Sequence, residues 1–205
     1  MDYTAHLSKD KKLKKLISQH EAFQLKQKKN ICIYLCASIM SQQLSTKVAT
    51  VIYNRFLDLF GGGEPSPEQI LDTPLTTLRS IGLSNAKASY VHNVAKFTLE
   101  KGMSVKKLNR MSNDELIEYF TEIKGVGKWT TEMLLMFALG REDVFAVDDL
   151  GIQNAMIGLY KLNKDDKKQL KLDMLQISQK WSPYRTYACL HLWHWKDNIP
   201  VKENK

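Results

Sequence analysis

The stretch Ile123-Lys124-Gly125-Val126-Gly127-Lys128-Trp129-Thr130 decides the fold of this chain of 205 residues. Its two glycines separate two segments, residues 116–123 and 129–139, in which apolar residues recur every three or four positions. That spacing indicates amphipathic helices, and Gly140 stands where the second helix should stop. Glycine allows the chain to turn tightly between them. We therefore predict a helix, a two-glycine hairpin and a second helix.

The main-chain amides of this hairpin form a predicted anion site. Amides at the turn and at the start of the second helix point toward the same place, where the helix dipole favours negative charge. Such amides contact phosphate rather than base edges, so they position a nucleic acid without reading its sequence. The candidate DNA contacts are Gly125, Val126, Gly127, Lys128 and Thr130.

Helical signals continue through the rest of the chain. One predicted helix face ends at Gly61-Gly62-Gly63 and consists of Leu44, Val48, Val51, Ile52, Phe56 and Leu59. Ser66, Ser84 and Ser112 fit helix N-caps, and two of them begin capping boxes. No segment shows the sustained two-residue alternation of a half-buried strand. The sequence therefore predicts an all-α protein.

Three pieces of the chain, in this order, resemble the helix-hairpin-helix DNA glycosylase superfamily, and within it the alkylpurine (3-methyladenine type II) glycosylases. The resemblance spans roughly residues 30–195. It implies a single glycosylase domain with two all-helical lobes and the active site in the cleft between them. Lobe A takes roughly residues 1–35 and 145–205, and lobe B residues 36–144. The pieces are Ile39-Met40-Ser41-Gln42-Gln43-Leu44-Ser45, residues 124–152, and residues 181–193.

The pair Asp148-Asp149 supplies the candidate catalytic carboxylate. Cleaving a base from deoxyribose leaves positive charge on the sugar, which a nearby carboxylate stabilises. The resemblance implies that Asp149 has this role, because the apolar Ile152 follows it by three positions. We expect Asp148 to be an N-cap or a loop brace. Without the resemblance, an Asp-Asp pair before a helix is more often a capping signal.

Trp129 bears on the reaction type. Relatives that also nick the DNA backbone have a lysine at this position, whose amine forms a Schiff base with the sugar. Indole cannot do this, and Lys128 is rotated by about 100° on the helix. The resemblance therefore implies a monofunctional glycosylase that uses water and leaves the strand intact.

The base pocket is also assigned by resemblance. A purine alkylated at N3 or N7 is cationic, leaves readily, and stacks well on indole. Trp129 and Trp193 are expected to line this pocket, with the pliable Met133 where some relatives keep a tyrosine. For Trp181 and Tyr187 we prefer a role in the core.

Gln43 matches the position that fills the gap left by a flipped base in the family. From the residues alone, it is equally a polar side chain on an exposed helix edge.

The charge balance suits a polyanionic partner. The formal charge is +8 and the isoelectric point is near 9.3. Residues 1–30 hold eight lysines against three acidic residues, so much of the excess is N-terminal. We interpret the lysine run at residues 9–15 as a solvated helix face rather than a dedicated DNA contact. Double-stranded DNA with alkylated bases is the expected partner, bound by a monomer.

Cofactors are predicted to be few. Cys32, Cys36 and Cys189 are too few for a disulfide framework, and they exclude the four-cysteine iron-sulfur cluster of some relatives. The resemblance implies at most a monovalent cation at the main-chain carbonyls of Thr121, Ile123 and Val126.

No apolar run approaches the ~20 residues of a membrane span. We expect an intracellular protein, at the nucleoid in a bacterium and nuclear in a eukaryote.

Two other functions stay open. One is a bifunctional glycosylase and lyase for oxidised pyrimidines, which Trp129 and the missing cysteines oppose. The other is a non-enzymatic DNA-binding module, which Asp149 and the paired tryptophans oppose. The ranking of N3-methyladenine, N7-methylguanine, etheno adducts and hypoxanthine as substrates is not fixed by the sequence.

Overall fold

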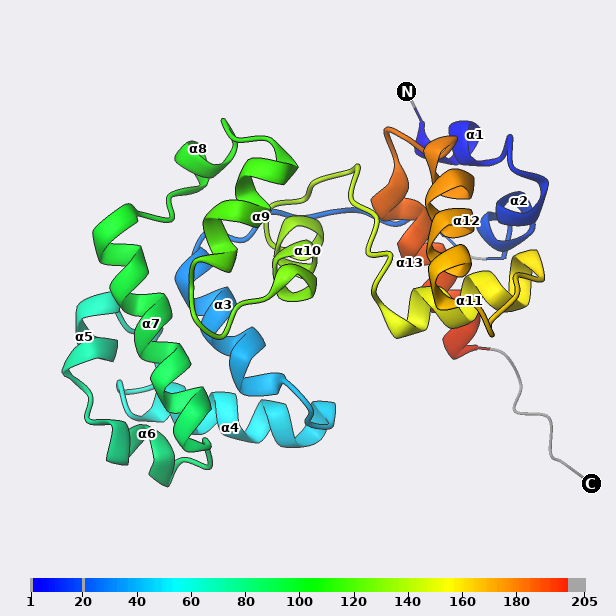
Figure 1. Cartoon of the computed structure of the whole chain (residues 1–205). Helices are drawn as coiled ribbons and strands as arrows, with labels where there is room; N and C mark the ends of the chain where they lie inside the picture. The colour runs from blue at the N-terminus through cyan, green and yellow to red at the C-terminus, as the bar shows by residue number, and fades with distance from the viewer. Residues whose placement is uncertain (1, 20, 199–205) are drawn as a thin grey trace, which may run out of the picture. The chain divides into compact units, whose positions relative to one another are not determined.

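The computed structural model describes residues 2–19 and 21–198, and its regular elements there are all helices (Figure 1). No strand occurs within these ranges, so the predicted all-α class is confirmed. The helices are α1 (Tyr3–Leu7), α2 (Lys11–Ile17), α3 (Ile31–Ser41), α4 (Thr46–Asp58), α5 (Pro67–Asp72), α6 (Leu75–Ser80), α7 (Asn85–Lys101), α8 (Val105–Leu108), α9 (Asn113–Thr121), α10 (Lys128–Phe137), α11 (Leu150–Tyr160), α12 (Lys167–Gln179) and α13 (Arg185–Asp197).

The chain forms two compact units. Unit 1 contains residues 1–26 and 140–205, and unit 2 contains residues 27–139. The two changes of lobe were expected near residues 35 and 144. The first comes earlier in the structure because α3 is one uninterrupted helix that packs wholly in unit 2. The second follows Leu139, where Gly140 takes a φ of 65° just beyond α10.

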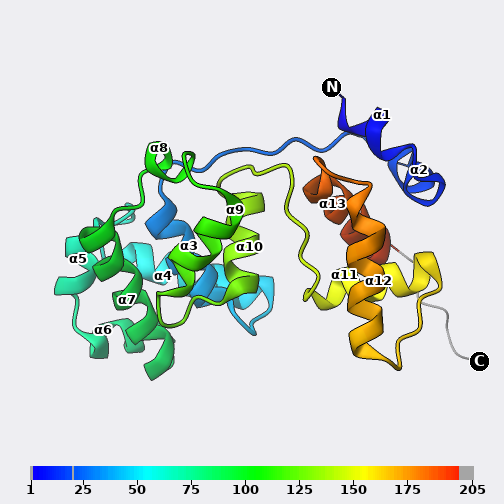
Figure 2. The ribbon, with the colours of Figure 1, turned by 45° about the horizontal axis from the view of Figure 1, so that its top comes forward.

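Helix α3 is the centre of unit 2. It packs against α4, α7 and α10, while α5 and α6 lie along α7 in both ribbon views (Figures 1 and 2). Serine side chains cap five of the helices of unit 2, α4, α5, α7, α8 and α9, as the sequence predicts for three of them. Ser66 and Ser112 complete capping boxes with Gln69 and Glu115. The buried side chains of α3 are Ile31, Cys32, Ile33, Leu35, Cys36, Ile39 and Met40.

The predicted apolar face of α4 is wrong in its extent. Only Ile52 and Phe56 of that face are buried. The helix has α3 as its main packing partner, so the rest of the stripe faces solvent. The exposed members of the stripe are Leu44, Val48, Val51 and Leu59.

Unit 1 is built around the packed pair α11 and α13. Helices α1 and α2 rest on it, and the ring of Tyr3 stacks on Tyr187 with 3.9 Å between ring centroids. Trp181 is fully buried, and its ring meets Phe145 edge-on. The core roles predicted for Trp181 and Tyr187 are therefore confirmed.

Asp10 ties the N-terminal helices to the C-terminal ones. Its carboxylate caps α2 and accepts hydrogen bonds from Tyr160 Oη at 2.7 Å, Lys180 Nζ at 2.9 Å and Trp181 Nε1 at 3.1 Å. Burial alone would raise the pKa of Asp10. The hydrogen bonds from Lys180, Tyr160, Trp181 and the Lys12 amide outweigh burial and lower the pKa from 3.8 to about 2.

The lysine run beside Asp10 lies on the surface of α2. Lys11, Lys14 and Lys15 are exposed, whereas Lys12 turns inward and donates to the Leu159 carbonyl at 2.8 Å.

No described helix combines the length and apolar character needed to cross a bilayer.

Replacing Asp10 by Asn tests this tie. A carboxylate with a lowered folded-state pKa stabilises the fold above its unfolded pKa, and the effect is lost as pH falls through about 2. Asp10→Asn should therefore lower the unfolding free energy by about 2 kcal/mol at pH 7. Urea denaturation should also show a shallower loss of stability below pH 4 than in the wild type. Equal slopes in the two proteins would contradict the role of Asp10; Asp165→Asn, at an exposed position, is the control.

Candidate functional site

The two-glycine hairpin lies between α9 and α10, as the sequence predicts. Its turn is closed by a hydrogen bond from Val126 N to Ile123 O at 2.9 Å. Thr131 N then donates to Gly127 O at 3.0 Å and begins the bonding of α10. The second helix runs from Lys128 to Phe137, slightly earlier than the predicted segment.

The two hairpin glycines serve different purposes. Gly125 has a φ of 108°, and a Cβ there would lie 2.3 to 2.7 Å from atoms of Tyr90. Gly127 has an ordinary negative φ, and a Cβ there would meet no atom within 4 Å. The first glycine is therefore required by packing within unit 2. The second leaves open space at the start of α10.

The first turn of α10 can receive an anion through its main chain. Gly127 is its N-cap and provides no capping side chain, so the cap leaves room at the leading amides. The side chains of Val126 and Thr130 are buried, each with 4% exposure, so their contribution to an anion is limited to their backbone groups. Lys128 is exposed, and its Nζ lies 3.8 Å from Glu132 Oε1.

Trp129 and Met133 occupy one face of α10, a single turn apart. The indole is 44% exposed, whereas Met133 is buried. Behind them, Tyr34 of α3 donates its hydroxyl to the Met133 carbonyl at 3.3 Å. Tyr34 is not among the predicted site residues, because it lies within the apolar run of α3 and belongs to no motif.

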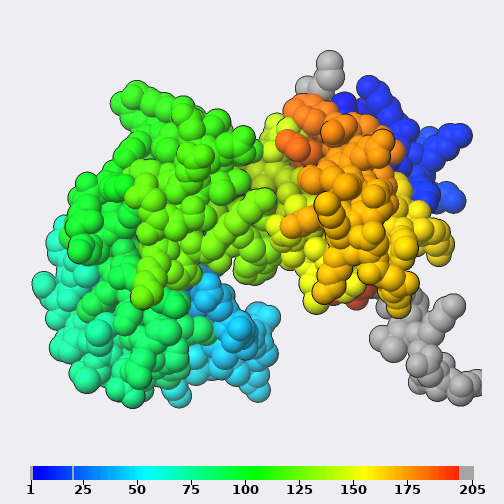
Figure 3. Space-filling model, viewed as in Figure 1, coloured from blue at the N-terminus to red at the C-terminus, as the bar shows by residue number. Residues whose placement is uncertain are grey.

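Gln43 stands in the short loop between α3 and α4. It is exposed and adopts the left-handed φ of 59°, which is uncommon for a residue other than glycine. The loop is held from α7 by Lys87, whose Nζ donates to Met40 O at 2.9 Å and to Gln42 O at 2.7 Å. Burial lowers the pKa of Lys87. This part of unit 2, blue to cyan, reaches the surface at the lower edge of the space-filling view (Figure 3).

In unit 1, Asp149 is the N-cap of α11. Its Oδ1 accepts two hydrogen bonds of 2.8 Å, one from Ile152 N and one from Trp193 Nε1. The N-cap role considered for Asp148 is therefore wrong, because Asp149 begins the helix. Asp148 instead pairs with Lys171 of α12, which is the bracing role that was the other expectation.

Gly151 makes the contact between Asp149 and Trp193 possible. A Cβ at residue 151 would lie 3.0 Å from Asp149 Oδ1 and from Trp193 Cδ1 and Nε1. Trp193 was predicted to line the base pocket, and its hydrogen bond to the Asp149 carboxylate was not predicted. The only sequence signal for it is the glycine two residues after Asp149.

The hairpin carbonyls are the candidate cation ligands. Those of Thr121, Ile123 and Val126 are neutral oxygens that suit a monovalent ion, and Ile123 O keeps one lone pair beyond the Val126 amide it accepts. Among the described residues, no three His, Cys, Asp or Glu side chains are grouped as metal ligands. The three cysteines are buried thiols.

Residues 36–180 match the family model of the HhH-GPD superfamily of base excision DNA repair proteins. The chain belongs to the HhH-GPD superfamily. The resemblance inferred from the three sequence pieces is therefore confirmed, and with it the fold class.

This HhH-GPD protein is similar to DNA-3-methyladenine glycosylase 1 of Schizosaccharomyces pombe, with 38% identity over 89% of this chain and 80% of the relative. A solved structure of 3-methyladenine DNA glycosylase from that organism, in complex with abasic DNA, superposes with a TM-score of 0.81 at 35% identity. It covers 96% of this chain and 97% of the other. A DNA-3-methyladenine glycosidase from Bacillus halodurans also gives a TM-score of 0.81, at 36% identity over 94% and 88% of the two chains.

The two hairpin glycines should respond differently to alanine. Gly125→Ala places a Cβ against Tyr90 at a left-handed φ, so it should lower the unfolding free energy by about 3 kcal/mol. Gly127→Ala should cost about 1 kcal/mol or less, because there is room for the methyl group. It should nevertheless weaken binding to undamaged duplex DNA about tenfold, because the methyl group keeps phosphate away from the amides.

Thermal unfolding and fluorescence anisotropy with a labelled duplex measure these two effects. Equal stability losses in both variants, or undiminished DNA binding by Gly127→Ala, would contradict this division of roles.

Proposed function

We propose that this HhH-GPD protein is a monofunctional DNA glycosylase that hydrolyses the N-glycosidic bond of alkylated purines, such as N3-methyladenine and N7-methylguanine, in duplex DNA. One observation carries the proposal: the Asp149 carboxylate is fixed by the Ile152 amide and the Trp193 indole at the start of α11. The similarity to 3-methyladenine glycosylases over nearly the whole chain supports the same substrate class.

The proposed chemistry follows from the charge of Asp149. As the glycosidic bond breaks, its electron pair moves to the cationic purine and neutralises it, while positive charge develops on the deoxyribose. An ionised carboxylate held in place stabilises that charge without having to reorganise. Water then bonds to C1′ and loses a proton, which leaves an abasic sugar in an intact strand. The leaving base is neutral, so the reaction needs no strong general acid.

A lyase step is absent from this proposal. It requires an amine nucleophile at the sugar, and the residue at the corresponding position of α10 is Trp129. Lys128 is the neighbouring amine, and its Nζ lies toward Glu132 rather than on the face of Trp129 and Met133.

Duplex DNA is held, in this proposal, by the hairpin amides and opened at Gln43. The hairpin offers backbone groups at Gly125, Gly127 and the start of α10, which suit phosphate. Gln43 fills the space of the flipped nucleotide, and Lys87 fixes the loop that carries it. A monovalent cation at the Thr121, Ile123 and Val126 carbonyls would hold the hairpin in shape, and the protein would act as a monomer.

Replacing Asp149 by Asn tests the proposal with little structural change. The amide oxygen of Asn can still cap α11 and accept from Trp193, so the melting temperature should stay close to that of the wild type. Single-turnover release of methylated purines should fall by about 100-fold or more, because the negative charge is lost. Asp148→Asn is the matched control and should keep its excision rate.

Retention of full base release by Asp149→Asn would refute this role of the carboxylate. Binding of methylated DNA without base release by the wild type would favour the non-enzymatic module instead.

Replacing Trp193 by Phe separates hydrogen bonding from stacking. Phenylalanine keeps an aromatic ring but removes the N–H that Asp149 Oδ1 accepts at 2.8 Å. Single-turnover excision should fall about tenfold while damaged-DNA affinity changes little, since a hydrogen bond to a charged group is lost. Trp195→Phe, on the same helix but packed beside Gly158, should leave the excision rate unchanged. A loss of affinity with an unchanged rate in Trp193→Phe would assign the indole to base stacking alone.

A further inference from the structure

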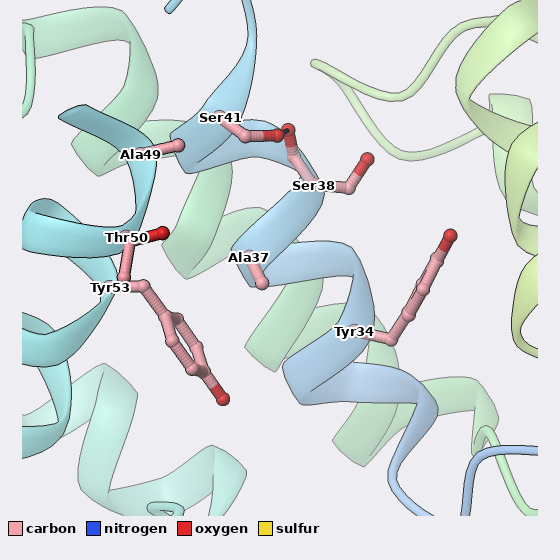
Figure 4. A pocket seen from close by; sticks show the side chains of 7 residues that line it. All are labelled: Tyr34, Ala37, Ser38, Ser41, Ala49, Thr50 and Tyr53. Atoms are coloured by element: carbon pink, nitrogen blue, oxygen red, sulfur yellow. Dashed lines mark hydrogen bonds between the residues drawn. The ribbon is translucent and has the colours of Figure 1, made fainter. Parts of the chain in front are cut away.

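A groove runs between α3 and α4 of unit 2, with a volume of about 350 Å³ (Figure 4). Figure 4 shows the lining side chains on the two neighbouring helices, with Tyr34 pointing away from α4. Its size falls in the range of small-molecule sites, about 300 to 1,000 Å³. The lining residues are Tyr34, Ala37, Ser38 and Ser41 on α3, with Ala49, Thr50 and Tyr53 on α4.

The groove begins beside the loop that carries Gln43. Ser41, one of its lining residues, is the last residue of α3 and precedes Gln43 by two positions. Farther along α3, Tyr34 lines the groove and reaches the carbonyl of Met133, the residue one turn beyond Trp129. A nucleotide displaced at Gln43 would therefore meet this groove next to the aromatic face of α10.

Three of the five hydroxyl groups that line the groove are oriented as acceptors, whereas those of Ser38 and Tyr53 can donate or accept. Each hydroxyl has one proton, and three of them give it to main-chain carbonyls. Tyr34 Oη donates to Met133 O at 3.3 Å, Ser41 Oγ to Ser38 O at 2.8 Å and Thr50 Oγ1 to Thr46 O at 2.9 Å. What remains for a ligand is the lone pairs of these oxygens. The lining contains no side chain with a nitrogen donor.

Charged groups lie beyond one end of the groove. A second hollow, of about 500 Å³, shares Tyr34 and Tyr53 with it and opens toward Lys28, Lys29 and Glu64. Glu64 is anchored by Asn30 Nδ2 at 2.9 Å. The stretch between Tyr34 and Ser41 is thus neutral, aromatic at one end and rich in acceptors. Such a lining offers no positive charge to a phosphate and favours a planar ligand with N–H donors or positive charge.

We propose that the α3/α4 groove is a base-reading subsite that accepts cationic purines with a free exocyclic amino group. The inference rests on the proposed glycosylase function and specifies its substrates. A methylated adenine offers two N6–H donors, for which the groove provides acceptor oxygens on Tyr34, Ser41 and Thr50. In 1,N6-ethenoadenine the added ring removes both donors, and in hypoxanthine a carbonyl replaces the amine and faces the same oxygens. The groove therefore selects N3-methyladenine over both.

The test compares selectivity rather than activity alone. Wild type, Tyr34→Phe and Ser41→Ala are incubated with methylated DNA and with duplexes containing one ethenoadenine or one hypoxanthine, and single-turnover rates are measured. The wild type should release N3-methyladenine faster than the other two bases. Each variant should lower the ratio of the N3-methyladenine release rate to the rates for the other two bases about tenfold. The change should come mainly from slower N3-methyladenine release, because one acceptor for an amino group is lost.

Tyr119→Phe is the matched control. It removes a phenol oxygen of the same unit that accepts from Lys107 and shares its one proton between the Lys101 and Gly102 carbonyls, away from the groove. This variant should keep the wild-type ratio. A filling variant, Ala37→Met, should slow the release of all three bases by occupying the groove.

The outcomes separate this inference from the function on which it rests. A wild type that releases no alkylated purine refutes the proposed function. A wild type that releases them, with ratios that stay unchanged in Tyr34→Phe and Ser41→Ala, refutes the base-reading groove alone. Equal rates for N3-methyladenine and ethenoadenine in the wild type would also overturn it.

Discussion

The proposed chemistry depends on one fixed oxygen. Asp149 Oδ1 accepts the Ile152 amide and the Trp193 indole at the same distance of 2.8 Å, so both the start of α11 and the side of α13 determine where the carboxylate lies. This arrangement requires glycine at residue 151, because a side chain there would crowd both Asp149 Oδ1 and the Trp193 indole. The packing of α11 on α13 therefore builds the core of unit 1 and also fixes the Asp149 carboxylate. The hydrogen bond between Trp181 and Asp10 reinforces this packing.

In unit 2, contacts from within the unit likewise fix the loops that expose groups to DNA. Gly125 lets the hairpin pass against Tyr90, and Lys87 draws the carbonyls of Met40 and Gln42 toward α7. Both contacts fix loops whose outer atoms are exposed, the hairpin amides in one case and Gln43 in the other. Holding such loops from within reduces the conformational entropy that would be lost when DNA binds. Three acceptor oxygens between α3 and α4 are fixed similarly, since the hydroxyl protons of Tyr34, Ser41 and Thr50 are donated to main-chain carbonyls.

Local patterns predicted most of the fold. Capping serines, the glycine hairpin and the helical spacing act over a few residues, so they can be read without tertiary structure. The outer stripe of α4 and the first lobe boundary could not be predicted in this way, because both depend on which helix packs against which. At the candidate site, sequence motifs predicted Asp149 and the hairpin. The tie from Trp193, the clamp by Lys87 and the position of Tyr34 join residues 44 to 99 positions apart, and no local pattern encodes such pairs.

The most direct test of base excision by this protein is to identify what the purified protein releases from methylated duplex DNA. Chromatography of the soluble fraction should yield free N3-methyladenine and N7-methylguanine. Electrophoresis of the DNA should show full-length strands that break only after heat or alkali, as abasic sites do. Recovery of the DNA with every methylated base still attached would contradict the account, as would immediate strand scission with a borohydride-trapped protein adduct.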